Sequence, residues 1–288
     1  MSRFTDEYKI KYEGCLKRVQ KPARYIGNEF GSVHKKWSDD MLTFAFCFPD
    51  VYEVGMSHLG MKILYHMLNE REDTVCERVF APWDDMEQEM RKEGIPLLSM
   101  ESYVPVKNFD FIGFTLQYEM SYSNIVNMLD LAGVPLRTAE RTAGDPFVCC
   151  GGPCAYHAEP LSDFVDFFIL GEGEEVNSEI MDVYKEWKNS GSTDRDDFLM
   201  SIIPLGGVYV PKFYDVEYND DNTISRFEPN REGVPKQVRK RIILNMDNTY
   251  VPKKLIVPFM ETVHDRIMLE LFRGCIRGCR FCQAGYIY

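Results

Sequence analysis

The sequence predicts an α/β fold, with a doubly wound parallel sheet of about five strands followed by a β-rich connector. Three observations predict this class. Short apolar runs of strand length alternate with amphipathic helical patterns, and short glycine-rich turns join them. The 288 residues are 45% hydrophobic and 27% charged, which is the composition of a folded globular protein. A chain of this length holds one large domain or two of ordinary size.

The strand candidates are apolar runs that stop at turn residues, as buried parallel strands do. They span residues 43–48, 75–80, 109–116, 146–150 and 166–170. Helical patterns separate these runs. The first places Ile63, Leu64, Met67 and Leu68 on one face, the next two cover about 83–92 and 121–131 (the latter ending at Gly133 as a C-cap), and the last aligns Val176, Ile180, Val183, Tyr184 and Trp187.

Changes in composition along the chain predict its organisation. A polar stretch at 189–194 marks the main boundary, and beyond it the patterns favour strands at 207–211, 213–218 and 223–227. We expect an N-terminal arm with one helix over 1–40, the α/β domain over 41–190, the β-rich connector over 191–265, and a last strand with its loop over 266–288.

Glycine-rich loops follow three of the predicted strands, at 55–60, 151–152 and 171–173. Ligands of open parallel sheets bind at the carboxyl ends of the strands, where these loops fall. In the third loop Glu172 and Glu174 would repel a phosphate group, so this loop is predicted to be a turn and a helix N-terminus. The neighbouring thiols of Cys149, Cys150 and Cys154 are expected in the core and not as ligands.

The formal charge of −12 argues against a general affinity for nucleic acid, although residues 236–241 form a local basic run. No stretch has the length of apolar sequence that a membrane span needs, and the N-terminus does not resemble a signal peptide. We therefore expect a cytoplasmic protein without a membrane partner, whose nine cysteines are thiols or ligands.

Three of those cysteines, Cys275, Cys279 and Cys282, have the spacing C-x3-C-x2-C after an apolar, strand-like run at 266–271. Thiolates are the ligands of iron–sulfur clusters and of zinc. A structural zinc site would need a fourth ligand, and the nearest histidine, His264, lies upstream at an unusual spacing. The spacing favours an iron–sulfur cluster with one open coordination position; zinc, or no metal, stays open.

This motif, with its flanking residues 263–266 and 273–275, resembles the signature of the radical S-adenosylmethionine enzymes. The stretches at 48–60, 113–119, 151–153 and 171–174 resemble one group of them, which has an N-terminal cobalamin-binding-like domain. The resemblance extends from about residue 21 to residue 285. It implies a flavodoxin-like domain followed by a partial (β/α) barrel.

The resemblance implies that Cys275, Cys279 and Cys282 hold a [4Fe–4S] cluster whose fourth iron binds S-adenosylmethionine. An electron, from a donor such as flavodoxin or ferredoxin, would cleave this sulfonium to methionine and a 5′-deoxyadenosyl radical. Phe281 matches the position that lies near the adenine. The substrate is not predicted, because the remaining barrel residues would lie past Tyr288. We expect the chain to be the truncated front part of a longer enzyme, inactive alone, with an exposed and labile cluster.

Cobalamin is the further cofactor that the resemblance suggests, and it implies binding residues in the glycine loops: Gly55, Ser57, His58, Gly60, Gly151, Gly152, Gly171 and Gly173. The usual cobalt-ligating motif D-x-H-x-x-G is broken here. Met56 replaces its aspartate, and Gly60 follows His58 by two positions and not three. A metal-bound imidazole needs a partner on its other nitrogen, so His58 is expected at a helix start or in packing. Cobalamin bound without a histidine ligand, and a vestigial domain, both stay open.

Two other functions are compatible with the same residues. One is a corrinoid or small-ligand binding module with a structural or sensory iron–sulfur cluster. The other is a zinc-stabilised α/β protein without redox chemistry. Metal analysis distinguishes the second from the rest.

Overall fold

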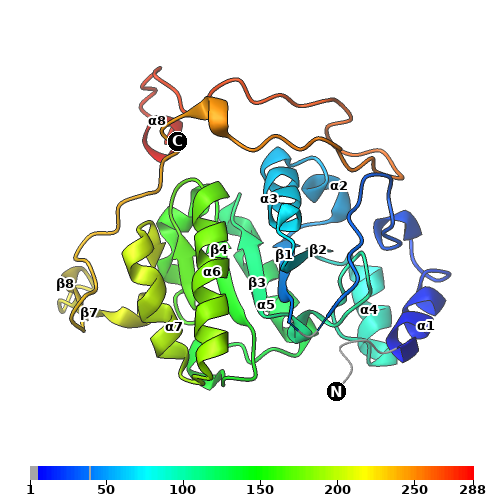
Figure 1. Cartoon of the computed structure of the whole chain (residues 1–288), viewed down its shortest axis with the longest axis horizontal. Coiled ribbons are helices and arrows are strands. Elements are labelled where there is room, and N and C mark those ends of the chain that lie inside the picture. The colour runs from blue at the N-terminus through cyan, green and yellow to red at the C-terminus, as the bar shows by residue number, and fades with distance from the viewer. Residues whose placement is uncertain (1–5, 39) are drawn as a thin grey trace.

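A computed structural model describes residues 6–38 and 40–288. Its main sheet has six strands in the order β2-β1-β3-β4-β5-β6 (Figure 1). The first five are parallel, and β6 pairs antiparallel with β5. Their bounds are β1 Leu42–Phe48, β2 Thr74–Phe80, β3 Phe111–Thr115, β4 Phe147–Gly151, β5 Phe167–Ile169 and β6 Val208–Tyr209. The predicted parallel sheet is confirmed, and residues 207–211 of the predicted connector supply its sixth strand.

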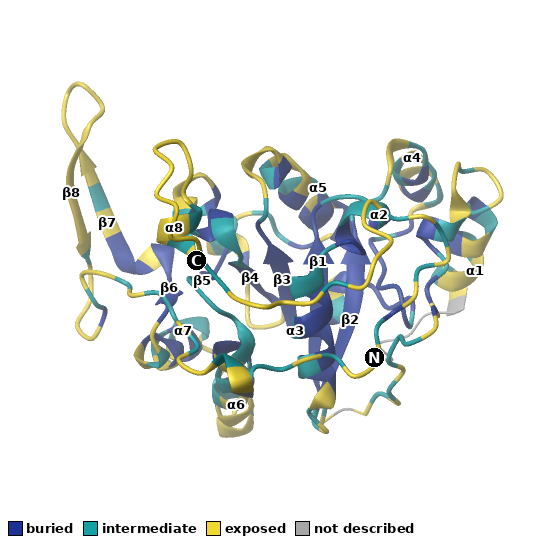
Figure 2. Cartoon of the chain, turned by 90° about the horizontal axis from the view of Figure 1, so that it is seen from above, coloured by how far each residue is buried: buried dark blue, intermediate teal, exposed yellow. Residues whose placement is uncertain are grey.

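Helices cover both faces of the sheet, which explains why its strands are continuous apolar runs (Figure 2). On one face lie α3, α6 and α7, and on the other lie α4 and α5, with α1 beside α4. The α-helices are α1 Asp6–Cys15, α2 Tyr52–Gly55, α3 Leu59–Glu70, α4 Asp84–Glu93, α5 Tyr122–Ala132, α6 Glu174–Ser190, α7 Arg195–Ile202 and α8 Ala284–Ile287. Gly133 ends α5 with φ 68°, as predicted for a C-cap. Helix α7 was not predicted.

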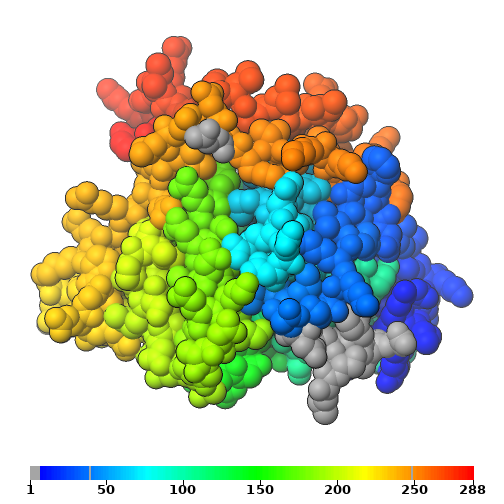
Figure 3. Space-filling view, viewed as in Figure 1, coloured from blue at the N-terminus to red at the C-terminus, as the bar shows by residue number. Residues whose placement is uncertain are grey.

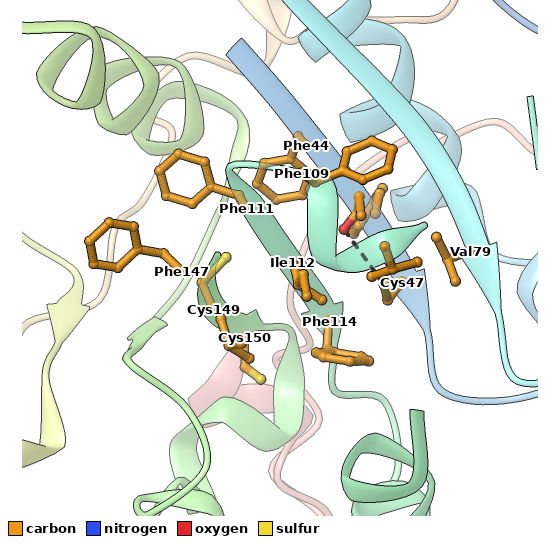
Figure 4. Packing of buried hydrophobic residues seen from close by; sticks show 14 of the residues in the cluster. Phe44, Cys47, Val79, Phe109, Phe111, Ile112, Phe114, Phe147, Cys149 and Cys150 are labelled. Atoms are coloured by element: carbon orange, nitrogen blue, oxygen red, sulfur yellow. Dashed lines mark hydrogen bonds between the residues drawn. The ribbon is translucent and has the colours of Figure 1, made fainter. Parts of the chain in front are cut away.

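Aromatic rings fill the layer between the sheet and helices α6 and α7. Phe111 of β3 lies 5.9 Å from Phe147 of β4 and 4.6 Å from Tyr184 of α6, measured between ring centroids. Phe198 of α7 packs on Phe147 at 4.5 Å. The thiols of Cys149 and Cys150, neighbours in β4, are both buried and point to opposite faces of the sheet (Figure 4). The prediction that these cysteines are core residues is confirmed.

A buried charge network covers the open edge of the sheet at β2. Arg78 of β2, whose side chain is 1% exposed, lies between two equally buried carboxylates. Its Nη2 donates to Glu29 of the N-terminal arm at 2.6 Å, and its Nε donates to Glu101 at 2.6 Å. Burial opposes the charge of Arg78, but Glu101 and Glu29 outweigh it and raise the pKa of Arg78. The network thus ties the arm and the loop around Glu101 to the edge strand.

The region after β6 forms a separate two-stranded hairpin. Strands β7 Tyr214–Tyr218 and β8 Ile224–Pro229 pair antiparallel, close to the two strands predicted here. Asn222 in the connecting turn has φ 64°, a conformation that asparagine tolerates. The hairpin extends away from the main sheet and is largely exposed (Figure 2).

Residues 236–288 cross the carboxyl edge of the main sheet, and we call this segment the strap. It runs out to the N-terminal arm, where Val257 N donates to Phe30 O at 2.8 Å, and then returns to the far end of the sheet (Figures 1 and 3). The strand predicted at 266–271 is not formed. These residues pair with no described strand and are mostly exposed, so their backbone groups lack the ladder that a strand requires. No helix in the described part of the chain is long and apolar enough to cross a membrane.

His66 of α3 makes the stability of the fold sensitive to acid. Burial, and then the charge of Arg78, lower the pKa of His66 to about 4, from 6.5 in a free side chain. Its Nε2 is buried and has no hydrogen-bond partner among the described residues. Because protonation favours the unfolded chain, the free energy of unfolding should fall by about 3 kcal/mol as the pH drops from about 6.5 to about 4. Urea unfolding across this range should show a weaker pH dependence for His66→Phe. The variant His34→Gln, at an exposed histidine, should keep the wild-type dependence; equal profiles for all three proteins would contradict this role of His66.

Candidate functional site

A cavity of about 830 Å³ opens at the carboxyl edge of the main sheet. It lies between β1, β3 and β4 on one side and the N-terminal turns of α3 and α6 on the other. The chain enters the sheet at β1, moves outward to β2, and then returns to place β3 on the other side of β1. This reversal leaves a crevice between the loops after β1 and β3, which is where open α/β sheets bind ligands.

The inner wall of the cavity is apolar. Phe44 and Phe46 of β1, Gly113 of β3 and Cys149 of β4 face it from the sheet, and α3 contributes Ile63 and Leu64. Gly113 is needed here because a Cβ at this position would lie 2.3 Å from the ring of Phe44. The chemistry of this wall suits a flat or elongated apolar group.

His58 lies at the cavity mouth and caps α3. Its Nδ1 accepts a hydrogen bond from Met61 N at 3.1 Å, so in the neutral imidazole the proton is on Nε2. Burial lowers the pKa of His58, an effect that the Gln117 side chain opposes. Since Nδ1 is used as an acceptor, Nε2 has no free lone pair for cobalt in the neutral ring. The predicted helix-start role of His58 is confirmed, and this geometry does not suit a cobalt ligand.

Six of the eight residues predicted to contact cobalamin line the cavity: His58, Gly60, Gly151, Gly152, Gly171 and Gly173. The other two are absent from the lining. Gly55 lies under Phe80 and Phe48. Ser57 donates to Glu53 O at 2.7 Å and accepts from His264 N at 3.0 Å, so it anchors the strap.

Gly171 contacts the strap directly. It has φ 97°, and a Cβ there would lie 2.2 Å from Arg241 O, closer than any side chain allows. Arg241 N donates to Leu170 O at 2.8 Å, and Glu172 N donates to Arg241 O at 3.0 Å. Gly171 is therefore required for docking the strap, a role that the glycine pattern alone did not reveal.

The strap closes part of the cavity mouth with two of its segments. One runs from Lys240 to Ile243, and the other from Glu270 to Gly274. Lys240 Nζ also donates to the carbonyl oxygens of Tyr286 and Ile287 at 3.1 and 3.0 Å. These bonds hold the C-terminal end of α8 beside the same opening.

Arg273 forms a cluster of ion pairs between the strap and the α/β layer. Its guanidinium pairs with Glu172 at 3.1 Å, with Glu174 in the first turn of α6, and with Glu270 at 2.8 Å. The hydrogen bond to Glu270, with help from Glu174 and Glu172, raises the pKa of Arg273 against the effect of burial. The loop at 171–174 is thus the predicted turn and helix N-terminus, and its carboxylates bind a cation from the strap.

The three cysteines of the motif stand on the loop that this contact supports. Cys275, Cys279 and Cys282 are exposed free thiols, and the side chain of Phe281 is 92% exposed. The segment next to α8 is coloured as exposed in Figure 2. In the described part of the chain, no three acidic, histidine or cysteine side chains are gathered as a metal site would require. The donor set still fits an iron–sulfur cluster, because three thiols on one loop are the ligands that such clusters use.

The sequence prediction missed three side chains that shape the mouth: Arg273, Lys240 and Gln117. Only Arg273 had a visible signal, since it directly precedes Gly274 and Cys275 and follows Glu270 at the i, i+3 spacing. Lys240 donates to carbonyl oxygens of Tyr286 and Ile287, a distant segment that no local pattern reports. Gln117 donates to Thr115, two residues before it, and this local bond gives no sign of a place at the mouth.

Comparison with known proteins agrees with the predicted family. A family model described as "Radical SAM proteins, N-terminal" matches residues 60–211, which are just over half of the chain and end before the thiol loop. An uncharacterized protein of Methanocaldococcus jannaschii is 23% identical over 245 residues, which are 85% of this chain and 41% of that protein. The chain therefore spans well under half the length of this curated relative. No solved structure matches the chain.

Proposed function

The chain belongs to the family described as "Radical SAM proteins, N-terminal", and we propose that it is the front part of an enzyme that cleaves S-adenosylmethionine. Cys275, Cys279 and Cys282 would hold a [4Fe–4S] cluster through their thiolates. The observation that carries this proposal is the loop of three free, exposed thiols that directly follows residues 270–274, which line the cavity. When bound, such a cluster supplies one electron that breaks a carbon–sulfur bond of the sulfonium, giving methionine and a 5′-deoxyadenosyl radical.

The residues of this chain would bind and orient the reactants. Phe281, exposed beside Cys282, provides an aromatic surface for an adenine ring. Arg280, also exposed on this loop, carries positive charge that suits an acidic electron donor such as flavodoxin or ferredoxin. Substrate recognition would come from the (β/α) barrel that the family resemblance implies; this chain covers 41% of the relative's length.

The test is an anaerobic assay with S-adenosylmethionine and dithionite after reconstitution with iron and sulfide. A longer form of the protein that carries a complete barrel should release methionine and 5′-deoxyadenosine in equal amounts. The 288-residue chain alone should release neither. The absence of both products from the longer form would overturn the proposed activity, and turnover by the 288-residue chain would overturn the need for a barrel.

A second candidate function is a corrinoid or small-ligand binding module, and the cavity favours it. The strand order β2-β1-β3-β4-β5 is that of flavodoxin-like domains, and the opening lies at the edge where such domains bind ligands. We propose that cobalamin, if it is the ligand, enters without a histidine ligand, because His58 Nδ1 is engaged by Met61 N. Titration of cobalamin into the protein, followed by its absorption spectrum, tests this. An unchanged affinity in His58→Asn, whose side chain can still cap α3, is expected, and loss of binding would contradict it.

A further inference from the structure

A cluster of ion pairs joins the thiol loop of the strap to the wall of the cavity. Arg273 stands two residues before Cys275 and pairs with Glu172 and Glu174, and these two glutamates flank the N-terminus of α6 and line the cavity. The exposed fractions of the three side chains are 15%, 22% and 11%, so the pairs are largely shielded from water. Ion pairs of this kind are stronger than those on an open surface.

Three features distinguish this cluster from an isolated ion pair on the surface. The guanidinium meets three carboxylates at once, including Glu270 on its own segment. Glu172 also accepts a hydrogen bond from Ile243 N, so it holds both strap segments at the mouth. The carboxylate of Glu174 lies in the first turn of α6, where the helix dipole already stabilises negative charge.

We propose that Arg273 is a positioning residue that couples the thiol loop to the cavity through Glu172 and Glu174. This inference rests on the proposed function, because it gives the loop a cluster to position. A group bound by the three thiols and a ligand in the cavity would then lie on two sides of one short turn, residues 171–174. Binding on either side would restrain that turn and so influence the other side.

The test on the metal-free protein is hydrogen–deuterium exchange read in two peptides, residues 270–288 and 171–178. Arg273→Gln should speed exchange in both by about tenfold, as expected when shielded ion pairs that close a segment are lost. The exchange rates of Arg273→Lys should lie between those of the wild type and of Arg273→Gln, since an ammonium group cannot meet three carboxylates with the geometry of a guanidinium. The matched control is Arg277→Gln, which removes the same charge from an exposed position in the same loop and should leave both peptides unchanged.

A mutant cycle makes the coupling specific. The double variant Glu172→Gln, Glu174→Gln should reproduce the effect of Arg273→Gln, and combining all three changes should add little more, because each variant already removes the ion pairs of Arg273 with Glu172 and Glu174. Wild-type exchange in Arg273→Gln, an equal effect of Arg277→Gln, or full additivity in the cycle would each overturn the proposal.

The reconstituted protein provides a second readout. If the wild-type chain takes up a cluster, its spectrum is recorded after one-electron reduction with dithionite, since the oxidised [4Fe–4S] state has no electron paramagnetic resonance signal. Arg273→Gln should then alter the line shape while Arg277→Gln does not; unchanged line shapes in both would overturn the positioning role. If the wild-type chain takes up no cluster, the proposed function fails, while the exchange result still decides whether Arg273 couples the two segments.

Discussion

Replacing Arg78 by alanine is expected to lower the free energy of unfolding by about 3–5 kcal/mol, the cost of leaving buried carboxylates without their counter-charge. Arg78 contributes hydrogen bonds to Glu29 and Glu101 with every side chain 1% exposed, and Tyr52 OH donates to the same Glu29 at 2.7 Å. The loss would release the N-terminal arm from β2 and expose an edge strand. Equilibrium unfolding in urea measures the change.

The control for Arg78 is Arg91 of α4, which pairs with Glu87 and Asp130 at 2.9 Å but is 44% exposed. Arg91→Ala should cost less than about 1 kcal/mol. If Arg78→Ala does not accumulate as folded protein, the triple variant R78M/E29Q/E101Q removes all three buried charges together and should recover folding. A loss for Arg78→Ala as small as that for Arg91→Ala would contradict the account of this network.

Replacing any one of Cys275, Cys279 or Cys282 by serine is expected to abolish most of the iron that the protein retains after anaerobic reconstitution. Two thiolates on an exposed loop leave two irons of a cubane without protein ligands, so the cluster should be lost in buffer exchange. Iron is measured by elemental analysis of the desalted protein.

The matched control is Cys154→Ser, at a buried thiol whose pKa is raised to about 11 by burial and by Glu119. This thiol is not part of the motif, and its variant should retain wild-type iron. Iron content that is unchanged in all three motif variants, or that falls equally in Cys154→Ser, would show that the motif thiols are not the ligands.

The sheet was predictable because each strand carries its own signal. The run from Leu42 to Phe48 is buried along its whole length, and only a strand covered on both faces requires that pattern. The pairing of β1 with both β2 and β3 is not local, and neither is the closure of the β2 edge by Arg78 and Glu29, which lie 49 residues apart. Helix α7 was missed because it has only eight residues, and its buried side chains, Phe198, Leu199 and Ile202, are too few to form a clear helical pattern in the sequence.

The candidate site was predictable in its residues more than in their roles. Six of the eight predicted loop residues line the cavity and Gly55 and Ser57 do not. Gly171 is required by the backbone of Arg241, seventy residues further along the chain. The broken motif around His58 correctly indicated a helix start. Met61 N donates to Nδ1 of His58, whereas an imidazole that binds cobalt through Nε2 carries its proton on Nδ1. The cysteine spacing supplies the ligands of the proposed cluster, whereas the contact of Arg273 with Glu172 and Glu174 depends on how the strap folds back.

The iron and acid-labile sulfide content of the anaerobically reconstituted wild-type chain tests the central claim most directly. A chain in which Cys275, Cys279 and Cys282 hold a [4Fe–4S] cluster should bind about four irons and about four sulfides, with an absorption band that dithionite bleaches. Zinc without sulfide, or no metal at all, would contradict it.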